Sequence, residues 1–307
     1  MNTQAIKAEI KKSYGSIAKG NIQAGCCSTG TGCCTTNEFG TSMTENYSNV
    51  EGYQQQADLS LGCGLPTETA NIKAGDTVLD LGSGAGNDVF IARSIVGETG
   101  HVIGIDMTPE MVARALQNNQ KLGYKNVQFF LGEIENMQAI PDNTADVVIS
   151  NCVMNLVPDK EKAFREVYRV LKVGGHFSIS DIVVSGTLPH GILEAAEMVA
   201  GCVAGASEKG SYLGIIKSIG FKNIQIKKER LINLPDELLL QSITADELKA
   251  YKITNSGIYS ITVYADKLVE GSCCEKTDFG CCASDTKTTI QAEACCQTTS
   301  KNGSSCC

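Results

Sequence analysis

The chain has 307 residues, enough for a full hydrophobic core and about two domains on size grounds. It carries 26 basic and 34 acidic side chains, a net charge of −8, and its basic residues are scattered, so neither a nucleic-acid nor an anionic-membrane surface is expected. No apolar run reaches the ~18 residues of a membrane span, and residues 1–12 lack the apolar segment of a secretory signal. These features predict a cytoplasmic protein that acts on a small molecule.

The chain contains 15 cysteines, which in the reducing cytoplasm indicate thiol or metal chemistry more than a disulfide scaffold. Three stand alone in the middle of the chain, at Cys63, Cys152 and Cys202. The other twelve form adjacent pairs nearer the ends: Cys26/Cys27, Cys33/Cys34, Cys273/Cys274, Cys281/Cys282, Cys295/Cys296 and Cys306/Cys307.

Strands and helices are predicted to alternate through the first two thirds of the chain. A short helix at 3–14 and a Gly/Ser/Thr-rich loop at 25–42 come first. Then follow strands at 76–81, 101–105, 127–131, 146–150 and 176–182, with helices at 87–96, 109–121 and 160–171, the last stopped by Gly174 and Gly175. This alternation predicts an α/β fold with a doubly wound, mostly parallel sheet.

After residue 185 the order changes to a smaller α+β lobe that we expect to face the substrate. Its predicted elements are helices at 192–203, 211–219 and 235–251 and strands at 224–229 and 258–265. From residue 270 the chain is polar and carries eight cysteines, which predicts a disordered tail. The predicted domains are therefore an N-terminal helix and cysteine-pair loop (1–50), a donor-binding domain (51–188), a substrate lobe (189–268) and the tail (269–307).

A glycine-rich stretch from Asp80 to Asp88 follows the first strand, where an open α/β sheet binds nucleotides. A dinucleotide site usually has Gly or Ala where this chain has Asn87. Asp80 would repel a pyrophosphate, but it suits the ammonium and sulfonium groups of S-adenosylmethionine. Asp106 ends the second strand, where an acid binds ribose hydroxyls; taken alone, it is equally consistent with a cap of the next helix.

The three solitary cysteines point to the second substrate. Cys152 follows the fourth strand, beside the methyl group expected at that edge, and small residues flank both Cys63 and Cys202. Each alone is equally well explained as a small buried hydrophobe. Three thiolates meeting at one point would suit a soft, three-coordinate centre.

These motifs resemble those of the arsenite methyltransferases, over about residues 10–265 of this chain. The resemblance rests on 62–66 (GCGLP), 80–88, 106–110 (DMTPE), 150–156 (SNCVMNL) and 201–205 (GCVAG). It implies a class I methyltransferase fold with a Rossmann-like sheet, S-adenosylmethionine as cofactor and no permanent metal. The donor-binding residues would be Asp80, Gly82, Ser83, Gly84, Asp106, Met107, Ile134, Glu135 and Asn151.

The resemblance also assigns roles to the cysteines. As(III) would arrive as a thiol complex and exchange onto Cys152 and Cys202, with Cys63 as third ligand or disulfide partner. The arsenic lone pair would then attack the methyl group, and thioredoxin or glutathione would reset the cysteines. A fourth catalytic cysteine falls near Cys34, with Cys33, Cys26 and Cys27 as rivals. Such an enzyme would be a monomer that binds neither nucleic acid nor membrane.

Two other functions stay open at this point. The same sheet serves methyltransferases of quinone-like metabolites, and a thiol-rich metal-storage or sensing protein would also explain the cysteine pairs. Residues 59–61 (Leu-Ser-Leu) depart from the aromatic residues that many relatives have there. For the tail we favour arsenite capture and delivery over metal storage or a dispensable end.

Overall fold

The computed structural model describes residues 3–20, 45–199, 203, 205–254 and 256–268. The chain divides into two compact units, residues 1–270 and 271–307, and the description concerns the first. Cys202, the N-terminal cysteine pairs that include Cys34, and the predicted disordered tail lie outside the described residues.

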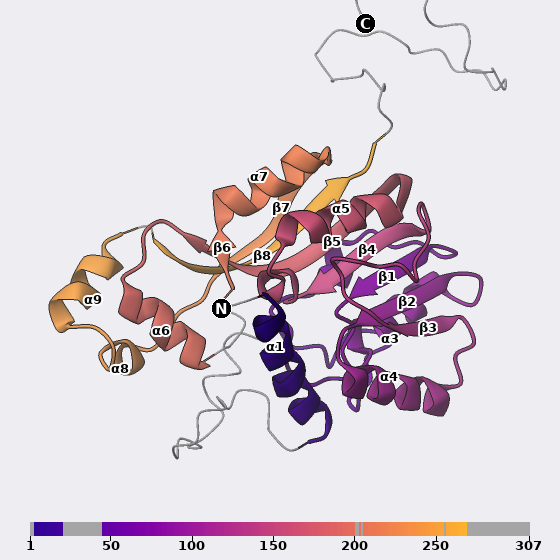
Figure 1. Ribbon diagram of the computed structural model, residues 1–307, viewed down its shortest axis with the longest axis horizontal. Coiled ribbons are helices and arrows are strands. Elements are labelled where there is room, and N and C mark those ends of the chain that lie inside the picture. The colour runs from indigo at the N-terminus through magenta and orange to yellow at the C-terminus, as the bar shows by residue number, and fades with distance from the viewer. Residues whose placement is uncertain (1–2, 21–44, 200–202, 204, 255, 269–307) are drawn as a thin grey trace, which may run out of the picture. The chain divides into compact units, whose positions relative to one another are not determined.

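One eight-stranded sheet forms the centre of the first unit, in the order β3-β2-β1-β4-β5-β8-β7, with β6 paired to β5 (Figure 1). β1 to β5 pair in parallel, and β8 runs antiparallel to both β5 and β7. This confirms the predicted doubly wound, mostly parallel sheet. The strands are β1 Thr77–Leu81, β2 His101–Asp106, β3 Val127–Leu131, β4 Ala145–Asn151, β5 Leu171–Ser185, β6 Ser207–Glu208, β7 Lys222–Leu231 and β8 Gly257–Asp266.

Helices cover both faces of this sheet, which is why its central strands are apolar on both sides. On one face α5 and α7 pack through Phe164 and Tyr212; on the other, α3 packs through Phe90. The helices are α1 Thr3–Ala18, α2 Pro66–Thr69, α3 Asn87–Val96, α4 Pro109–Leu122, the 3-10 turn η2 Met154–Leu156, α5 Lys160–Val170, α6 His190–Val199, α7 Lys209–Ile219, α8 Asp236–Leu239 and α9 Ala245–Lys252.

The strand register brings three chain segments to one edge of the sheet. Leu81, the last residue of β1, pairs with Ile105 of β2 and with Ser150 of β4. Because these strands are parallel, their carboxyl ends coincide. The glycine loop after Leu81, Asp106 and the Asn151–Cys152 dipeptide are therefore neighbours.

Two predicted helix boundaries are wrong. The helix expected over 160–171 ends at Val170, before Gly174 and Gly175, because Leu171 already has extended geometry and pairs with Ala145. The strand expected at 176–182 accordingly runs from Leu171 to Ser185.

The helix predicted over 235–251 is two helices, α8 and α9. Thr244 begins the second through a capping box: its hydroxyl accepts from the Glu247 N–H, and the Glu247 carboxylate accepts from the Thr244 N–H. The apolar spacing continues across the break, so the break cannot be detected from periodicity alone.

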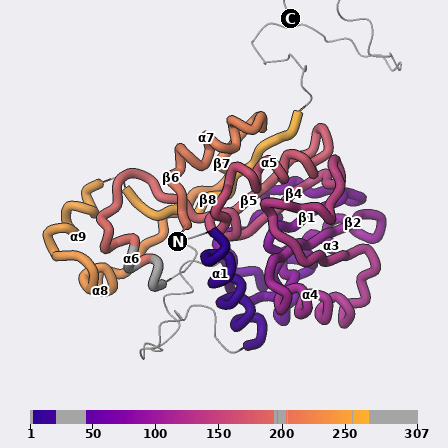
Figure 2. The backbone as a smooth tube through the Cα atoms, in the orientation of Figure 1, coloured from indigo at the N-terminus to yellow at the C-terminus, as the bar shows by residue number. Residues whose placement is uncertain are grey.

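Helices α6, α8 and α9 gather beyond β6, away from β3 and α4 (Figure 2). They enclose a small core of their own, made of Ile192, Leu239, Ile243 and Leu248. β7 and β8 come from the part of the sequence assigned to the substrate lobe, and they extend the central sheet beyond β5. The domain boundaries within residues 1–268 stay predictions.

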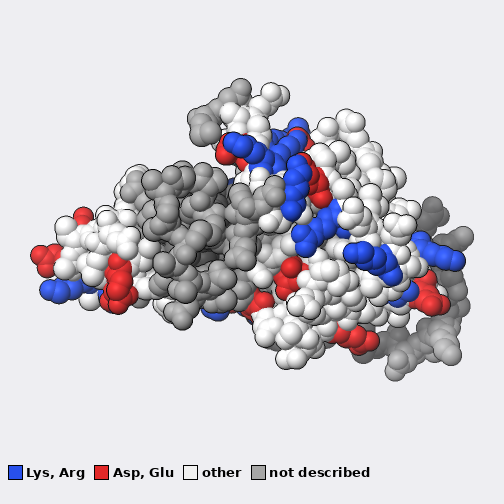
Figure 3. Space-filling view, turned by 90° about the horizontal axis from the view of Figure 1, so that it is seen from below, with Lys and Arg blue, Asp and Glu red and all other residues white. Residues whose placement is uncertain are grey.

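The charged side chains are of both signs and interspersed on the face drawn in Figure 3. Among the described residues, no helix is long and apolar enough to cross a membrane.

Candidate functional site

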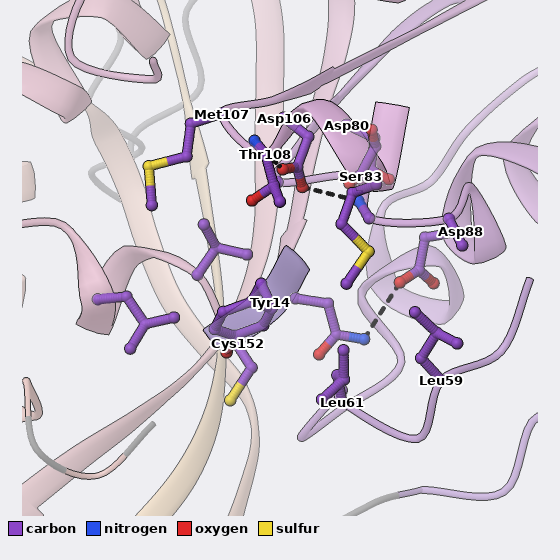
Figure 4. Close-up of a pocket in the computed structure, with 18 of the residues that line it drawn as sticks. Tyr14, Leu59, Leu61, Asp80, Ser83, Asp88, Asp106, Met107, Thr108 and Cys152 are labelled. Carbon is purple, nitrogen blue, oxygen red and sulfur yellow. Dashed lines mark hydrogen bonds between the residues drawn. The ribbon is translucent and has the colours of Figure 1, made fainter. Parts of the chain in front are cut away.

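A pocket lies at the carboxyl ends of the central strands, and it contains every residue predicted to bind the donor. Helix α1 and the loop before α2 contribute another part of its wall, including Tyr14, Leu59 and Leu61 (Figure 4). The predicted residues that line it are Asp80, Gly82, Ser83, Gly84, Asp106, Met107, Ile134, Glu135, Asn151 and Cys152. The donor-binding roles of these residues stay predictions.

Backbone hydrogen bonds fix the glycine loop against the neighbouring strand. The N–H groups of Gly82 and Ser83 both donate to the Ile105 carbonyl, at 2.8 and 3.0 Å. The Asp106 carboxylate accepts from the N–H groups of Gly84, at 3.0 Å, and Thr108, at 2.8 Å. Asp106 therefore fixes the glycine loop and also binds Thr108, the N-cap residue of α4.

Three buried carboxyl groups, Asp80, Asp88 and Asp106, lie along one side of the pocket (Figure 4). Burial raises the pKa of each group. The pKa of Asp80 lies well above its usual range, because the neighbouring charges of Asp88 and Asp106 add to the effect of burial. The pKa of Asp88 is raised to about 6. In Asp106 the hydrogen bonds from Thr108 and Gly84 partly offset the rise in pKa. No lysine or arginine of the described residues forms an ion pair with these carboxylates.

The pocket also holds buried polar atoms that the described residues leave unsatisfied. These are the Ser83 hydroxyl, Oδ1 of Asn87 and Oδ1 of Asp88. Buried polar groups ordinarily have partners, and buried carboxylates ordinarily face a cation. The pocket therefore suits a ligand with both positive charge and hydrogen-bonding groups, such as S-adenosylmethionine.

Asn151 joins this pocket to the loop that carries Cys63. Its Oδ1 accepts from the N–H groups of Cys63, at 3.0 Å, and Gly64, at 3.2 Å. Its Nδ2 donates to the Gly64 carbonyl at 2.8 Å and to Asp88 at 3.2 Å, and contacts the Tyr47 hydroxyl. Asn151 is therefore a positioning residue for both halves of the site.

Cys63 and Cys152 belong to one buried cluster, with exposed fractions of 2% and 4%. Cys152 has a φ of 60°, unusual for a residue with a side chain, and its N–H donates to the Ser180 carbonyl at 2.8 Å. The Cys63 carbonyl accepts from the Ser260 hydroxyl at 2.7 Å. Both cysteines are therefore held by backbone contacts to the sheet.

The glycines on either side of Cys63 are required by close packing. A Cβ atom at Gly62 would lie 2.6 Å from Nδ2 of Asn151, and one at Gly64 would lie 2.5 Å from the Ser180 hydroxyl. The Gly-Cys-Gly motif thus lets the Cys63 backbone approach β4 and β5.

Of the four cysteines assigned to catalysis, two lie in the described part of the chain, and the structure brings these together. Val203, which follows Cys202, packs in the same apolar cluster as Cys63 and Cys152. Cys202 itself and Cys34 lie outside the described residues, so their roles stay predictions. Within the described ranges, no group of three His, Cys, Asp or Glu side chains could hold a metal ion.

Sequence reasoning missed three further contributors. Asp88 looks like an ordinary acid in a first helical turn, yet it is buried and binds Tyr47 and Asn151. Tyr47 lies outside any helix or strand, so no periodicity marked it. Lys7 of α1 lines the pocket and pairs with Glu133 at 2.9 Å and with Glu135. The predicted short helix at 3–14 was the only signal for it.

Comparison with known proteins agrees with this geometry. Residues 72–239 match the methyltransferase domain family. The chain is 44% identical over 202 residues to an arsenite methyltransferase of Halobacterium salinarum and 34% identical over 246 residues to that of Homo sapiens. These stretches cover 66% and 76% of the chain, but it spans only 50% and 63% of those relatives' lengths.

A solved structure gives the same result. CrArsM, an arsenic(III) S-adenosylmethionine methyltransferase from Chlamydomonas reinhardtii, superposes with a TM-score of 0.57 at 32% identity, covering 76% of this chain and 75% of the other. The chain therefore belongs to the S-adenosylmethionine-dependent methyltransferases, in the family that includes the arsenite methyltransferases.

Proposed function

We propose that this protein methylates arsenite bound to its own cysteine sulfurs. The observation that carries the proposal is the position of Cys152: it lines the donor pocket and packs with Cys63 in one buried cluster. Thiolates are the preferred protein ligands of soft ions, and As(III) is one. The relatives that are named arsenite methyltransferases support the same acceptor.

The donor half would hold S-adenosylmethionine, which supplies an electrophilic methyl group when bound. Asp80 and Asp88, which are buried and have no cationic partner within the described part of the chain, suit its positive charges. Asp106 would bind the ribose hydroxyls and the Ile134–Glu135 segment would border the adenine, since all three residues line the pocket. Asn87 and Ser83 offer unsatisfied polar atoms to the remaining ligand groups.

The acceptor half needs orientation more than proton transfer. Trivalent arsenic has a lone pair and no proton to lose, so the reaction requires no general base. None of the three histidines, His101, His176 and His190, lines the pocket. Asn151 and Ser260 would instead fix the Cys63 backbone, so that arsenic is held facing the donor.

The remaining parts of the proposal come from the sequence. Cys202 would complete the arsenic site with Cys63 and Cys152, and Cys34 would join the disulfide exchange that follows. Thioredoxin or glutathione would restore the thiols, in the cytoplasm, and the enzyme would act as a monomer. As(III) would be delivered as a thiol complex.

The test is transfer of a labelled methyl group to arsenite with glutathione or thioredoxin present. Cys152→Ser and Cys202→Ser should each abolish transfer while donor binding stays intact. Normal turnover in both variants would rule out the arsenic assignment. Labelling of a quinone-like metabolite, with arsenite left unmethylated, would favour the alternative acceptor.

A second experiment concerns the cysteine-rich tail. Deleting residues 270–307 should lower the rate mainly at low arsenite if the tail captures and delivers the substrate. An unchanged dependence of rate on arsenite concentration would count against delivery.

A further inference from the structure

Behind the two cysteines lies a buried carboxyl group that the donor pocket does not use. Asp181 on β5 is fully buried, and it adjoins Ser180, whose carbonyl accepts the N–H of Cys152. Ile182 packs in the cluster that contains Cys63 and Cys152, and because successive side chains of a strand point to opposite faces, the Asp181 carboxyl faces the Tyr212 hydroxyl of α7 instead. That hydroxyl also interacts electrostatically with the Cys63 and Cys152 thiols, which links Asp181 to the proposed arsenic site.

The partners of Asp181 leave its charge incompletely compensated. It accepts hydrogen bonds from the backbone N–H of Ile182, at 3.1 Å, and from that of Asn155. The Tyr212 hydroxyl faces it from α7, yet both that hydroxyl and Oδ2 of Asp181 lack a partner at full hydrogen-bond geometry. An unsatisfied buried carboxylate oxygen is costly, so it calls for an explanation.

Lys160 is the cation that faces this region, but its hydrogen bonds go to backbone carbonyls and not to Asp181. Its Nζ donates to the carbonyls of Asn155, Val157 and Gly205 at 3.1 to 3.2 Å, which ties the turn after Cys152 to the loop after Cys202. It forms no ion pair within 4 Å with Asp181 among the described residues, although its charge helps to keep the pKa of Asp181 down.

We propose, on the basis of the proposed function, that Asp181 is an electrostatic positioning residue of methyl transfer. Its buried carboxylate stabilises the positive charge that forms on arsenic bound at Cys63 and Cys152. In the transfer, the arsenic lone pair forms the As–C bond, and the electrons of the breaking C–S bond stay on the donor sulfur. The sulfonium charge therefore ends on arsenic. A fixed charge in apolar surroundings acts strongly on such a change, because little water screens it.

Titration of Asp181 makes the inference testable. Burial raises its pKa to about 7, against the lowering effects of the Asn155 and Ile182 N–H groups, Lys160 and Tyr212. The other titratable groups of the region are the thiols of Cys63 and Cys152, which face Tyr212, and Glu135, which faces Lys160. Methyl transfer should therefore accelerate as pH rises through about 7, where Asp181 loses its proton.

The experiment is a single turnover of the full chain, loaded with arsenite and mixed with excess labelled donor. We expect Asp181→Asn to slow the step at least about tenfold above pH 8 and to remove the acceleration near pH 7. Donor affinity and the amount of bound arsenic should not change. Asp246→Asn, at a side chain that is 96% exposed, is the matched control and should keep the wild-type profile.

A second variant separates charge from structure. Tyr212→Phe removes a hydroxyl that lowers the pKa of Asp181, so the midpoint of the rate profile should move to higher pH. An Asp181→Asn enzyme with the wild-type rate and profile would overturn the inference, as would one that no longer binds arsenic. A wild-type protein that binds arsenite without methylating it would instead refute the proposed function, and the inference with it.

Discussion

The two halves of the site are built from opposite chemistry. The proposed donor half consists of carboxylates at the ends of β1 and β2 and in α3, which are buried and form no ion pair with the described lysines and arginines. The proposed acceptor half consists of sulfur atoms in an apolar cluster with Ile182 and Ile258. Under the proposed function, charge would select the donor, whereas softness and shape would select the acceptor.

The halves also differ in how they are held. The donor loop is fixed by backbone hydrogen bonds to β2 and by Asp106. The Cys63 loop has no regular structure and depends on side chains from β4 and β8, Asn151 and Ser260. Substitutions within one half should therefore affect either donor binding or arsenic binding alone. A substitution of Asn151, which contacts both halves, should affect both.

The largest effect is expected from Asp80→Asn. This change removes a buried charge while keeping the shape, so donor affinity should fall about 10-fold to 100-fold, as for loss of a charge-assisted contact. Calorimetric titration with S-adenosylmethionine measures it. Because the pKa of Asp80 is raised, the ligand-free variant should be more stable than the wild type, not less.

S-adenosylhomocysteine, which lacks the sulfonium charge, refines this result. An equal loss of affinity for both ligands would assign Asp80 to the ammonium group; a greater loss for the methylated donor would assign it to the sulfonium. Unchanged affinity for both would mean that the charge of Asp80 plays no part in donor selection.

Asn151→Ala should come next, because it affects both halves. It leaves the Cys63 and Gly64 N–H groups without their acceptor, and each buried unsatisfied group costs about 1–3 kcal/mol. Chemical denaturation should show that the free energy of unfolding falls by about 2–4 kcal/mol. Arsenite binding should weaken because the Cys63 loop is no longer held in place.

Asn126→Ala is the matched control for that variant. Asn126 also bridges segments through its side chain, accepting from Arg93 at 2.6 Å and donating to the Gly97 and Gly100 carbonyls, but near the amino end of β2. It should destabilise the fold without a specific effect on arsenite. Equal effects of both variants on arsenite binding would mean that Asn151 acts only through stability.

The sequence was sufficient to predict which segments meet at the proposed donor pocket, because their signals are local. The glycine loop, Asp106 and the Ile134–Glu135 segment each follow a strand with clear apolar patterning, and parallel strands bring their ends together. The helix break before Thr244 was missed because apolar spacing continues through it, although the Thr244 and Glu247 pair is a readable capping signature.

The acceptor half was predictable only in its cysteines. Tyr47, Ser260 and Asp181 contact residues that are distant in the chain, and nothing in their own neighbourhoods distinguishes them. Asp181 in particular sits in a run of strand residues, where an acid would normally face solvent. Only the register of β5 against its neighbours reveals its burial.

The pH dependence of the free energy of unfolding should report the ionisation of Asp181 independently of catalysis. Its folded-state pKa of about 7 lies above its ordinary value of 3.8, so the folded protein holds the proton more tightly and loses stability as pH rises between these values. Asparagine cannot ionise. Between pH 4 and pH 8, the free energy of unfolding of Asp181→Asn should therefore rise by about 1–3 kcal/mol relative to that of the wild type, as measured with denaturant. A difference in unfolding free energy that does not grow with pH would mean that Asp181 keeps an ordinary pKa.

The smallest effect concerns helix α1, which closes one wall of the donor pocket. Lys7, whose side chain is 15% exposed, pairs with Glu133 and Glu135 beside the adenine border. Lys7→Gln should weaken donor binding about twofold to fivefold at low salt, and the difference should shrink at high salt, as for a partly exposed ion pair. Lys19→Gln is the control, since Lys19 pairs with Glu110 at 2.8 Å, is 58% exposed and does not line the pocket. If both variants bind the donor equally well, α1 contributes to the pocket through its apolar contacts, Ile10 and Tyr14, and not through its charges.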